Sequence, residues 1–349
     1  MSDRSTQDRS DLERYSRQML FTPIGREGQQ RLDAARVLIV GCGALGSAQA
    51  EMLARAGVGH LRIVDRDFVE FTNLQRQTLF SESDATDRLP KAVAAKSRLA
   101  AINSGIQVES VVADVNNSNV ESLIKGSDLV VDGTDNFQVR YLLNEACVKN
   151  SVTWVYGAAV SSYGTTMTII PGERPCLRCI FPEMPDPGSS PTCDTAGVIM
   201  PIIMTIAATQ VTEAIKVLIG DVDSLHHSLM QFDLWTNERQ KIKLGTPDPD
   251  CNTCGRHDYE FLNASNSEFS AILCGRDAVQ IAPGNTNGLD LKVVGSRLAS
   301  LGEVKVNEYL LRFSSEGMEI TVFGDGRAII KGTDDIPTAR SLYARFIGT

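Results

Sequence analysis

The chain has 349 residues, enough to bury a sizeable core and, at roughly 150 residues per domain, to form about two domains. It carries 34 Lys and Arg against 43 Asp and Glu, a net charge of −9 with no basic block. This balance argues against nonspecific binding of nucleic acid or of anionic membranes. A hydrophobic content of 42% excludes a largely disordered chain.

Two uncharged stretches, 150–172 and 195–212, are long enough to be candidates for membrane-spanning segments. Ser, Thr and Gly interrupt the first stretch, which is typical of two strands. The second contains Pro201 and Gln210 and is marginal in length, so we expect a buried core helix there. The N-terminal residues lack the apolar segment of a secretory signal. We therefore expect a cytoplasmic protein, without a membrane partner, whose eight cysteines are not paired as disulfides.

Along the first part of the chain, strand patterns alternate with helix patterns. Apolar residues at helical spacing predict an N-terminal helical arm over 1–32. Strands are then predicted at 36–40, 61–65, 107–112 and 129–132, with helices ending at 56 and spanning 91–103 and 119–125. This alternation is typical of a doubly wound, Rossmann-like α/β fold with a mainly parallel sheet.

The second half adds an antiparallel segment and a further domain. It is predicted to contain a helix at 139–149, strands at 152–156 and 165–170, a loop at 171–192, an apolar helix at 198–218, and strands at 228–234 and 239–244. We expect the α/β domain to span 33–260, a linker 261–270, and a small α+β domain 271–349. In that last domain strands are predicted at 271–281, 304–306, 309–314, 318–323 and 327–331, and helices at 289–301 and 337–346.

A glycine motif follows the first predicted strand directly. Gly41, Gly43 and Gly46 follow the strand and open a helix, and Asp65 ends the next strand about twenty residues on. In this context glycines allow close approach of the backbone to phosphates at the helix N-terminus, and the acidic side chain accepts hydrogen bonds from ribose hydroxyls. The motif alone leaves NAD(P), FAD and ATP open.

Three charged residues favour ATP. Arg76, Lys91 and Asp135 lie near the predicted carboxyl ends of strands. Transfer of an adenylyl group from ATP needs cations to stabilise the departing pyrophosphate and a carboxylate to hold Mg²⁺. A nicotinamide-dependent oxidoreductase needs neither, and it is the alternative of a different class.

The cysteines form two Cys-x-x-Cys pairs and one isolated loop residue. Cys176 with Cys179 and Cys251 with Cys254 lie in turn-rich sequence and predict a closed, four-thiolate structural Zn²⁺ site. A thioredoxin-like redox pair is the alternative. Cys193 lies alone in the loop before the apolar helix.

These motifs together resemble the ThiF/MoeB/HesA family of adenylyltransferases, which are related to ubiquitin-activating enzymes. The resemblance covers about residues 12–256 and is carried by segments 13–18, 41–46, 73–77, 90–91, 134–136, 157–159, 175–179, 192–193, 196–198 and 251–254. It implies adenylation, with ATP and Mg²⁺, of the C-terminal glycine of a small β-grasp carrier. That carrier would be ThiS-like, for thiamine biosynthesis, or MoaD-like, for molybdopterin synthesis, and a sulfurtransferase is a possible further partner.

The resemblance also implies residue roles. Gly41 matches a backbone contact to ATP, Asp65 the ribose ligand, Asp135 the magnesium ligand, and Asn73, Arg76 and Lys91 the phosphate contacts. Arg17 matches an arginine that reaches the ATP of the neighbouring subunit in a homodimer. On sequence alone, an i,i+4 pair with Glu13 is the alternative for Arg17.

Two features leave more than one interpretation open. Cys193 matches the cysteine that becomes linked to the carrier in ThiF, and a small loop residue is its alternative role. The C-terminal extension favours a ThiF-like over a MoeB-like protein. Its Cys274 precedes Gly and Arg as in a sulfurtransferase loop, but the extension is short for such a domain. A non-catalytic scaffold that binds a carrier is the third alternative.

Overall fold

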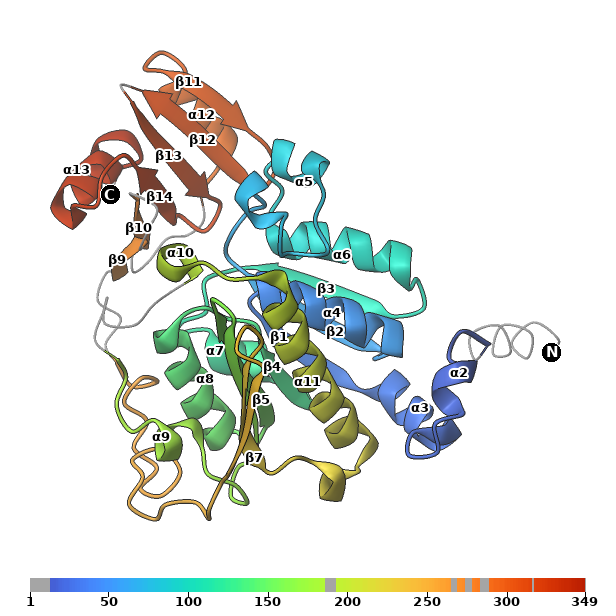
Figure 1. The fold of residues 1–349 in the computed structure, drawn as a ribbon. Coiled ribbons are helices and arrows are strands. Elements are labelled where there is room, and N and C mark those ends of the chain that lie inside the picture. The colour runs from blue at the N-terminus through green and yellow to red at the C-terminus, as the bar shows by residue number, and fades with distance from the viewer. Residues whose placement is uncertain are drawn as a thin grey trace. The chain divides into compact units, whose positions relative to one another are not determined.

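The chain forms two compact units in the computed structural model, Met1–Ala264 and Ser265–Thr349 (Figure 1). The structure describes residues 13–185, 193–264, 269–273, 278–282, 289–315 and 317–348.

The first unit is built on one eight-stranded sheet in the order β3-β2-β1-β4-β5-β6-β7-β8. Its strands are β1 Arg36–Val40, β2 His60–Asp65, β3 Gln107–Val112, β4 Leu129–Asp132, β5 Thr153–Val160, β6 Tyr163–Ile169, β7 Ser228–Asp233 and β8 Glu238–Lys243. The five neighbouring strands β3, β2, β1, β4 and β5 pair in parallel. Strands β6, β7 and β8 continue the sheet with antiparallel pairing. The predicted Rossmann-like sheet with an antiparallel segment is confirmed.

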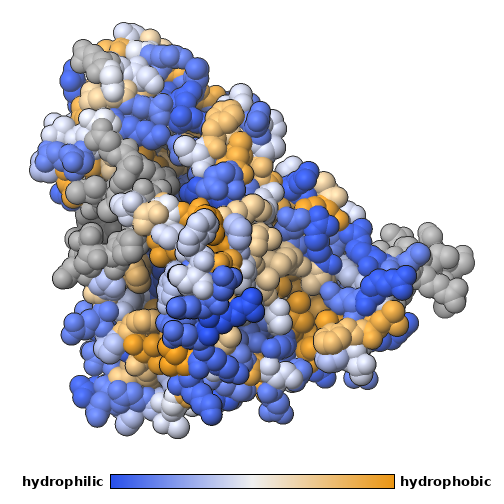
Figure 2. Space-filling view, in the orientation of Figure 1, coloured by the Kyte–Doolittle hydropathy of each residue, from blue (hydrophilic) through white to orange (hydrophobic). Residues whose placement is uncertain are grey.

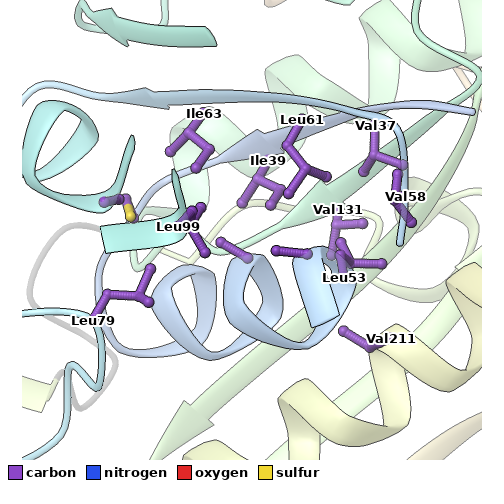
Figure 3. Packing of buried hydrophobic residues seen from close by; sticks show 14 of the residues in the cluster. Val37, Ile39, Leu53, Val58, Leu61, Ile63, Leu79, Leu99, Val131 and Val211 are labelled. Carbon is purple, nitrogen blue, oxygen red and sulfur yellow. The ribbon is translucent and has the colours of Figure 1, made fainter. Parts of the chain in front are cut away.

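Helices cover both faces of this sheet. They are α2 Ser16–Met19, α3 Gly25–Ala34, α4 Ala44–Ala56, α5 Glu82–Thr86, α6 Lys91–Ile102, α7 Val120–Ile124, α8 Phe137–Lys149, α9 Leu177–Ile180, α10 Cys193–Ala196 and α11 Met200–Ile219, with 3₁₀ turns η1 Phe71–Asn73 and η2 Val222–Ser224. Successive strand side chains point to opposite faces. Val37 and Ile39 therefore pack against α4 and α6, in the cluster that Figure 3 shows with Leu53 and Leu99, whereas Leu38 and Val40 pack with α7 and α8.

Helix α11 is long and apolar enough to cross a membrane by length and composition. It instead packs against α3, α4, β5 and β6 within the first unit. Two of its buried side chains, Gln210 and Glu213, make hydrogen bonds to neighbouring elements. These contacts are those of the core helix that the sequence predicts.

One short helix interrupts the predicted loop 171–192. Helix α9 begins directly after Cys176 and includes Cys179. Its Leu177 is buried, and the N–H of Leu177 donates to Asn144 Oδ1 at 2.8 Å. This tertiary contact is invisible to a local reading of a Pro- and Gly-rich segment. Residues 186–192 lie outside the described part of the chain.

The second unit is a six-stranded antiparallel sheet in the order β11-β12-β13-β14-β10-β9, with two helices that share one core with it. Its elements are β9 Phe269–Leu273, β10 Ala278–Ala282, α12 Leu291–Leu298, β11 Glu303–Val306, β12 Leu310–Ser315, β13 Met318–Phe323, β14 Ala328–Lys331 and α13 Ile336–Phe346. Where the sequence predicts one strand over 271–281, the structure has two antiparallel strands, because Leu273 pairs with Ala278. Cys274 lies outside the described residues.

Candidate functional site

The candidate site lies where the chain leaves the parallel sheet at the carboxyl ends of its strands. Strands β1 and β4 are neighbours, and the order of the sheet reverses between them. A crevice at such a reversal is the usual ligand site of open α/β sheets. Gly41 follows β1, Asp65 ends β2 and Asp135 follows β4, so the fold brings these three predicted residues to one edge.

The glycine turn is shaped by close approach of two backbone segments. Gly41 has φ +85°, and a Cβ there would lie 2.7 Å from the carbonyl oxygen of Gly133. A Cβ on Gly46 would lie 1.8 Å from the carbonyl oxygen of Gly41. A Cβ on Gly43, in contrast, would meet only Gln77 Nε2, at 3.9 Å, an ordinary van der Waals distance. Gly43 is therefore the least crowded of the three glycines, and it lies beside the first N–H groups of α4, which lack intrahelical partners.

Asp65 is fixed by backbone hydrogen bonds. Its side chain accepts from the N–H groups of Cys42 and Asp67, each at 2.6 Å. The residue is only 9% exposed, and this burial raises the pKa of its carboxyl. Each carboxylate oxygen has a second lone pair, so Asp65 retains acceptor capacity for two hydroxyl groups.

Lys91 lies close to this carboxylate at the start of α6. Its Nζ is 3.1 Å from Asp67 Oδ2, and its backbone N–H donates to the carbonyl of Asp67 at 2.9 Å. Lys91 is 4% exposed, and its charge opposes the effect of burial on the pKa of Asp65. A buried cation is thus held beside the predicted ribose ligand.

Asn73 and Arg76 belong to the η1 turn and the residues after it. Asn73 is 3% exposed, and its Oδ1 accepts from the N–H of Glu70 at 3.0 Å, so its amide nitrogen is left to donate. Arg76 Nη1 donates to the carbonyl of Thr72 at 2.9 Å. That contact leaves the other guanidinium donors of Arg76 for an anion.

The loop that carries Asp135 is held by a buried ion pair that sequence reasoning missed. Asp132 accepts from the N–H and Oγ1 of Thr134, at 2.8 and 2.7 Å, and pairs with Arg140 Nε at 3.3 Å. Arg140 also donates to the carbonyls of Thr134 and Gly157. Asp135 itself is exposed. A signal was available, since Asp132 ends an otherwise apolar strand.

Cys193 lies at the same edge of the sheet. It begins the short helix α10, is half-buried, and its Sγ lies 3.4 Å from the carbonyl oxygen of Ala159, near the end of β5. The chain after α10 is tied to the residue that follows β5, because Ser161 N–H donates to the carbonyl of Gly197 at 2.8 Å. The fold therefore brings Cys193 to the carboxyl edge of β5.

The four cysteines of the Cys-x-x-Cys pairs come together in a second cluster. Their sulfur atoms all lie within 4.8 Å of one another. Cys176 Sγ is 3.9 Å from Cys179 Sγ and 3.6 Å from Cys251 Sγ, and Cys179 Sγ is 3.3 Å from Cys254 Sγ. A tetrahedral zinc with Zn–S bonds of about 2.3 Å places its ligands about 3.8 Å apart. The donor set and spacing fit four-thiolate Zn²⁺.

Helix α8 supports this cysteine cluster with two buried polar residues that the sequence did not reveal. Asn144 Nδ2 donates to Cys176 Sγ at 3.5 Å. Glu145 accepts from the N–H groups of Phe261 and Leu262, at 2.8 and 2.9 Å. The segment after the second cysteine pair is thereby fastened to the body of the first unit.

Arg17 lies far from the glycine turn of its own chain. On either side of it, Gln18 Nε2 donates to the carbonyl of Ala56 and Tyr15 lies against Gly57, both at the C-terminal end of α4. The 13 residues of α4 make a helix about 20 Å long, with the glycine turn at its other end. Arg17 is exposed, and it forms no ion pair with Glu13, the alternative partner.

Comparison with known proteins gives a consistent picture. The ThiF family matches residues 15–253. Sulfur carrier protein ThiS adenylyltransferase of Bacillus subtilis (strain 168) is 46% identical over 337 residues, which cover 96% of this chain and 99% of that protein. SAMP-activating enzyme E1 of Haloferax volcanii is 41% identical over 248 residues, or 71% of this chain and 90% of that protein.

A solved structure shares the fold. Escherichia coli MccB superposes with a TM-score of 0.61 at 24% identity, covering 69% of this chain and 72% of that one. The family match spans well over half of the chain, and the Bacillus subtilis relative extends over both units. This chain belongs to the ThiF family, as its motifs predicted.

Proposed function

We propose that this chain is an ATP-dependent adenylyltransferase that activates the C-terminal glycine of a ThiS-like sulfur-carrier protein. The observation that carries the proposal is the carboxyl edge of the parallel sheet, where a glycine turn, a buried acidic acceptor and a buried lysine meet. The name of the Bacillus subtilis relative supports ThiS over MoaD as the type of carrier.

In the proposed complex each site residue has one task. The glycine turn lets the phosphates approach the N-terminus of α4, and Asp65 accepts the ribose hydroxyls. Asn73, Arg76 and Lys91 donate to the phosphates, and Asp135 binds the Mg²⁺ that enters with ATP. Asp135 suits this task because it is exposed while its loop is held by buried contacts.

The adenylation step depends on stabilising the negative charge of the leaving phosphates. The carboxylate of the carrier's terminal glycine attacks the α-phosphorus, the α–β phosphoanhydride bond breaks, and pyrophosphate leaves. Negative charge grows on the leaving phosphates, where Arg76, Lys91 and the metal would stabilise it. No thiol of the enzyme takes part in this step, so Cys193 is reserved for a later covalent link to the activated carrier.

Structural zinc is the second part of the proposal. Cys176, Cys179, Cys251 and Cys254 would hold one Zn²⁺ per chain in a closed site, because four thiolates fill its tetrahedral coordination. Such an ion stabilises the fold and leaves no position for substrate. It would join the segment at α9 to the residues before 260.

A homodimer is the third part. Leu20 and Phe21, beside Arg17, are 73% and 61% exposed, and Figure 2 shows hydrophobic surface over this end of the first unit. Exposed apolar groups next to an arginine that pairs with no described residue suit a surface that a second copy covers. Arg17 would then contact the ATP of that copy, because the glycine turn of its own chain is at the far end of α4.

A carrier-dependent exchange assay tests the function. Labelled pyrophosphate should enter ATP only when a carrier ending in Gly-Gly is present, and Asp135→Ala should abolish this exchange. Because Asp135 is exposed, the same variant should keep the melting temperature of the wild type. Binding of NAD(P) without exchange would favour an oxidoreductase, and carrier binding without exchange a scaffold.

A further inference from the structure

Gln77 is a buried side chain with unsatisfied hydrogen-bonding groups at the edge of the candidate site. The residue is 4% exposed, and its Oε1 is fully enclosed without a hydrogen bond. Among the described residues, none bonds to its amide nitrogen either. An enclosed amide oxygen without a partner costs about 1–3 kcal/mol, so the presence of the amide needs a reason.

The position of the Gln77 amide suggests why it is kept at this site. Gln77 Nε2 is the one atom within 4 Å of the position that a Cβ on Gly43 would take, at 3.9 Å. Gly43 is the N-cap of α4, a 13-residue helix, and makes no side-chain capping bond. The Nε2 donor of Gln77, which pairs with no described residue, therefore lies beside the N-terminus of α4.

The local backbone explains why the side chain is held there. The N–H of Gln77 donates to the carbonyl of Asn73 at 3.0 Å, so the two residues lie one turn apart on one face. Asn73 is also buried, and its oxygen is occupied by Glu70. Gln75, between them, is exposed. The turn thus presents two amide nitrogens inward and a third amide outward.

We propose that Gln77 is a phosphate-binding residue, which donates Nε2–H to a phosphate oxygen of the nucleotide at the N-terminus of α4. This inference rests on the proposed function and adds a residue to its site. A neutral amide donates to an anion without adding a third cation beside Arg76 and Lys91. In the free protein Nε2 pairs with no described residue, and the phosphate supplies its partner when the nucleotide binds.

The substitution Gln77→Met separates this role from a structural one. Methionine fills a similar volume without polar atoms, so it removes the unpaired amide. The ligand-free variant should melt no lower than the wild type, whereas a structural glutamine would cause a loss of stability. Binding of Mg·ATP, followed by calorimetry, should weaken by about 10- to 100-fold, the range for a hydrogen bond to a charged group. Binding of adenosine, which lacks phosphates, should not change.

Two further variants complete the test. Gln77→Glu keeps the shape but directs a negative charge at the phosphate, so it should weaken Mg·ATP binding more than Gln77→Met, again without affecting adenosine. If Gln77→Met fails to fold, this variant still decides the question. The matched control is Gln75→Met, which changes an exposed amide of the same turn and should bind Mg·ATP as the wild type does.

The outcomes separate the inference from the function on which it rests. Equal affinity of wild type and Gln77→Met for Mg·ATP overturns the role of Gln77 and leaves the adenylation proposal standing. A parallel loss of adenosine and Mg·ATP binding in Gln77→Met shows a structural residue and overturns the inference too. A wild type that binds neither ligand overturns both proposals.

Discussion

The glycine turn and the cysteine cluster differ in whether their buried polar groups have hydrogen-bond partners. At the turn, Gln77 Oε1 is enclosed without a hydrogen bond, and Gln77 Nε2 lies 3.9 Å from where a Cβ on Gly43 would stand. At the cluster, the four sulfurs lie within 4.8 Å of one another, and the amide of Asn144 bonds to one of them and to the backbone of Leu177. One region keeps an unsatisfied polar group, whereas the other is closed.

This difference indicates what each region binds. A substrate that comes and goes needs donors that are unpaired before it arrives, and the cost is borne by the free protein. A structural ion needs every coordination position filled by protein. The comparison therefore predicts that changes at the cysteine cluster reduce stability first, and that changes at the turn reduce binding first.

The largest expected effect comes from opening the closed region. Cys251→Ser removes one of four thiolates, and zinc then lacks its tetrahedral set. Structural zinc contributes of the order of 10 kcal/mol to folding in small peptides, so we expect loss of the ion and a large fall in melting temperature. Metal analysis should give about one zinc per wild-type chain. Cys193→Ser, a thiol outside the cluster, should keep the zinc. Equal zinc content in both variants would contradict the assignment.

A smaller effect is expected from the ion pair beneath the Asp135 loop. Arg140→Gln leaves Asp132 as a fully buried carboxylate without its cation, a loss of about 3–5 kcal/mol in unfolding free energy. Denaturant titration measures it. The control is Arg55→Gln, which breaks an exposed i,i+4 pair with Glu51 and should cost less than about 0.5 kcal/mol. Similar losses of unfolding free energy in Arg140→Gln and Arg55→Gln would show that burial does not determine how much an ion pair stabilises this protein.

These two regions also show how far the sequence predicts the structure. Strands β1, β3 and β4 were predicted to the residue, because each is a short run with clear ends. The site at the carboxyl edge could also be predicted, because parallel strands bring their carboxyl ends to one edge of the sheet. The site residues next to strands, such as Asp65, were therefore within reach of sequence reasoning.

Side-chain contacts between segments that are distant in the sequence could not be predicted from it. Arg140 meets Asp132 from the next helix, and Asn144 meets Cys176 across 32 positions. Nothing in the pattern of a helix shows which of its polar residues turns inward to a partner. The split of the predicted strand 271–281 has a similar origin, because apolar residues on both sides outweighed the polar stretch between them.

A pH dependence is the next effect in size. Burial raises the pKa of Glu145 from its ordinary 4.5 to about 7 in the folded protein. The folded carboxyl binds its proton more tightly than the unfolded one, so its stabilising contribution is complete below about pH 4.5 and is lost as pH rises to about 7. Glu145→Gln should lack this loss when melting temperature is measured across that range. Parallel curves for both proteins would contradict the prediction.

Glu121 provides a control of opposite sign. Hydrogen bonds from Asn150 and Lys149 lower the pKa of this carboxyl. Its contribution is present above the unfolded pKa and is lost as pH falls below it. Glu121→Gln should therefore be less stable than the wild type above that pKa, and the difference in melting temperature should shrink as pH falls below it. A change at the same pH in both variants would mean that neither group is responsible.

The smallest expected effect on adenylation concerns Cys193. The carrier's own carboxylate is the nucleophile in that step, so Cys193→Ala should leave pyrophosphate exchange at the wild-type rate. The same variant should lose any covalent adduct with the carrier, which forms when the sulfur attacks the acyl adenylate and AMP departs. Intact-mass measurement without reductant detects the adduct. Loss of exchange in Cys193→Ala would instead place the thiol within the first step, and the open edge of the sheet would then serve one reaction and not two.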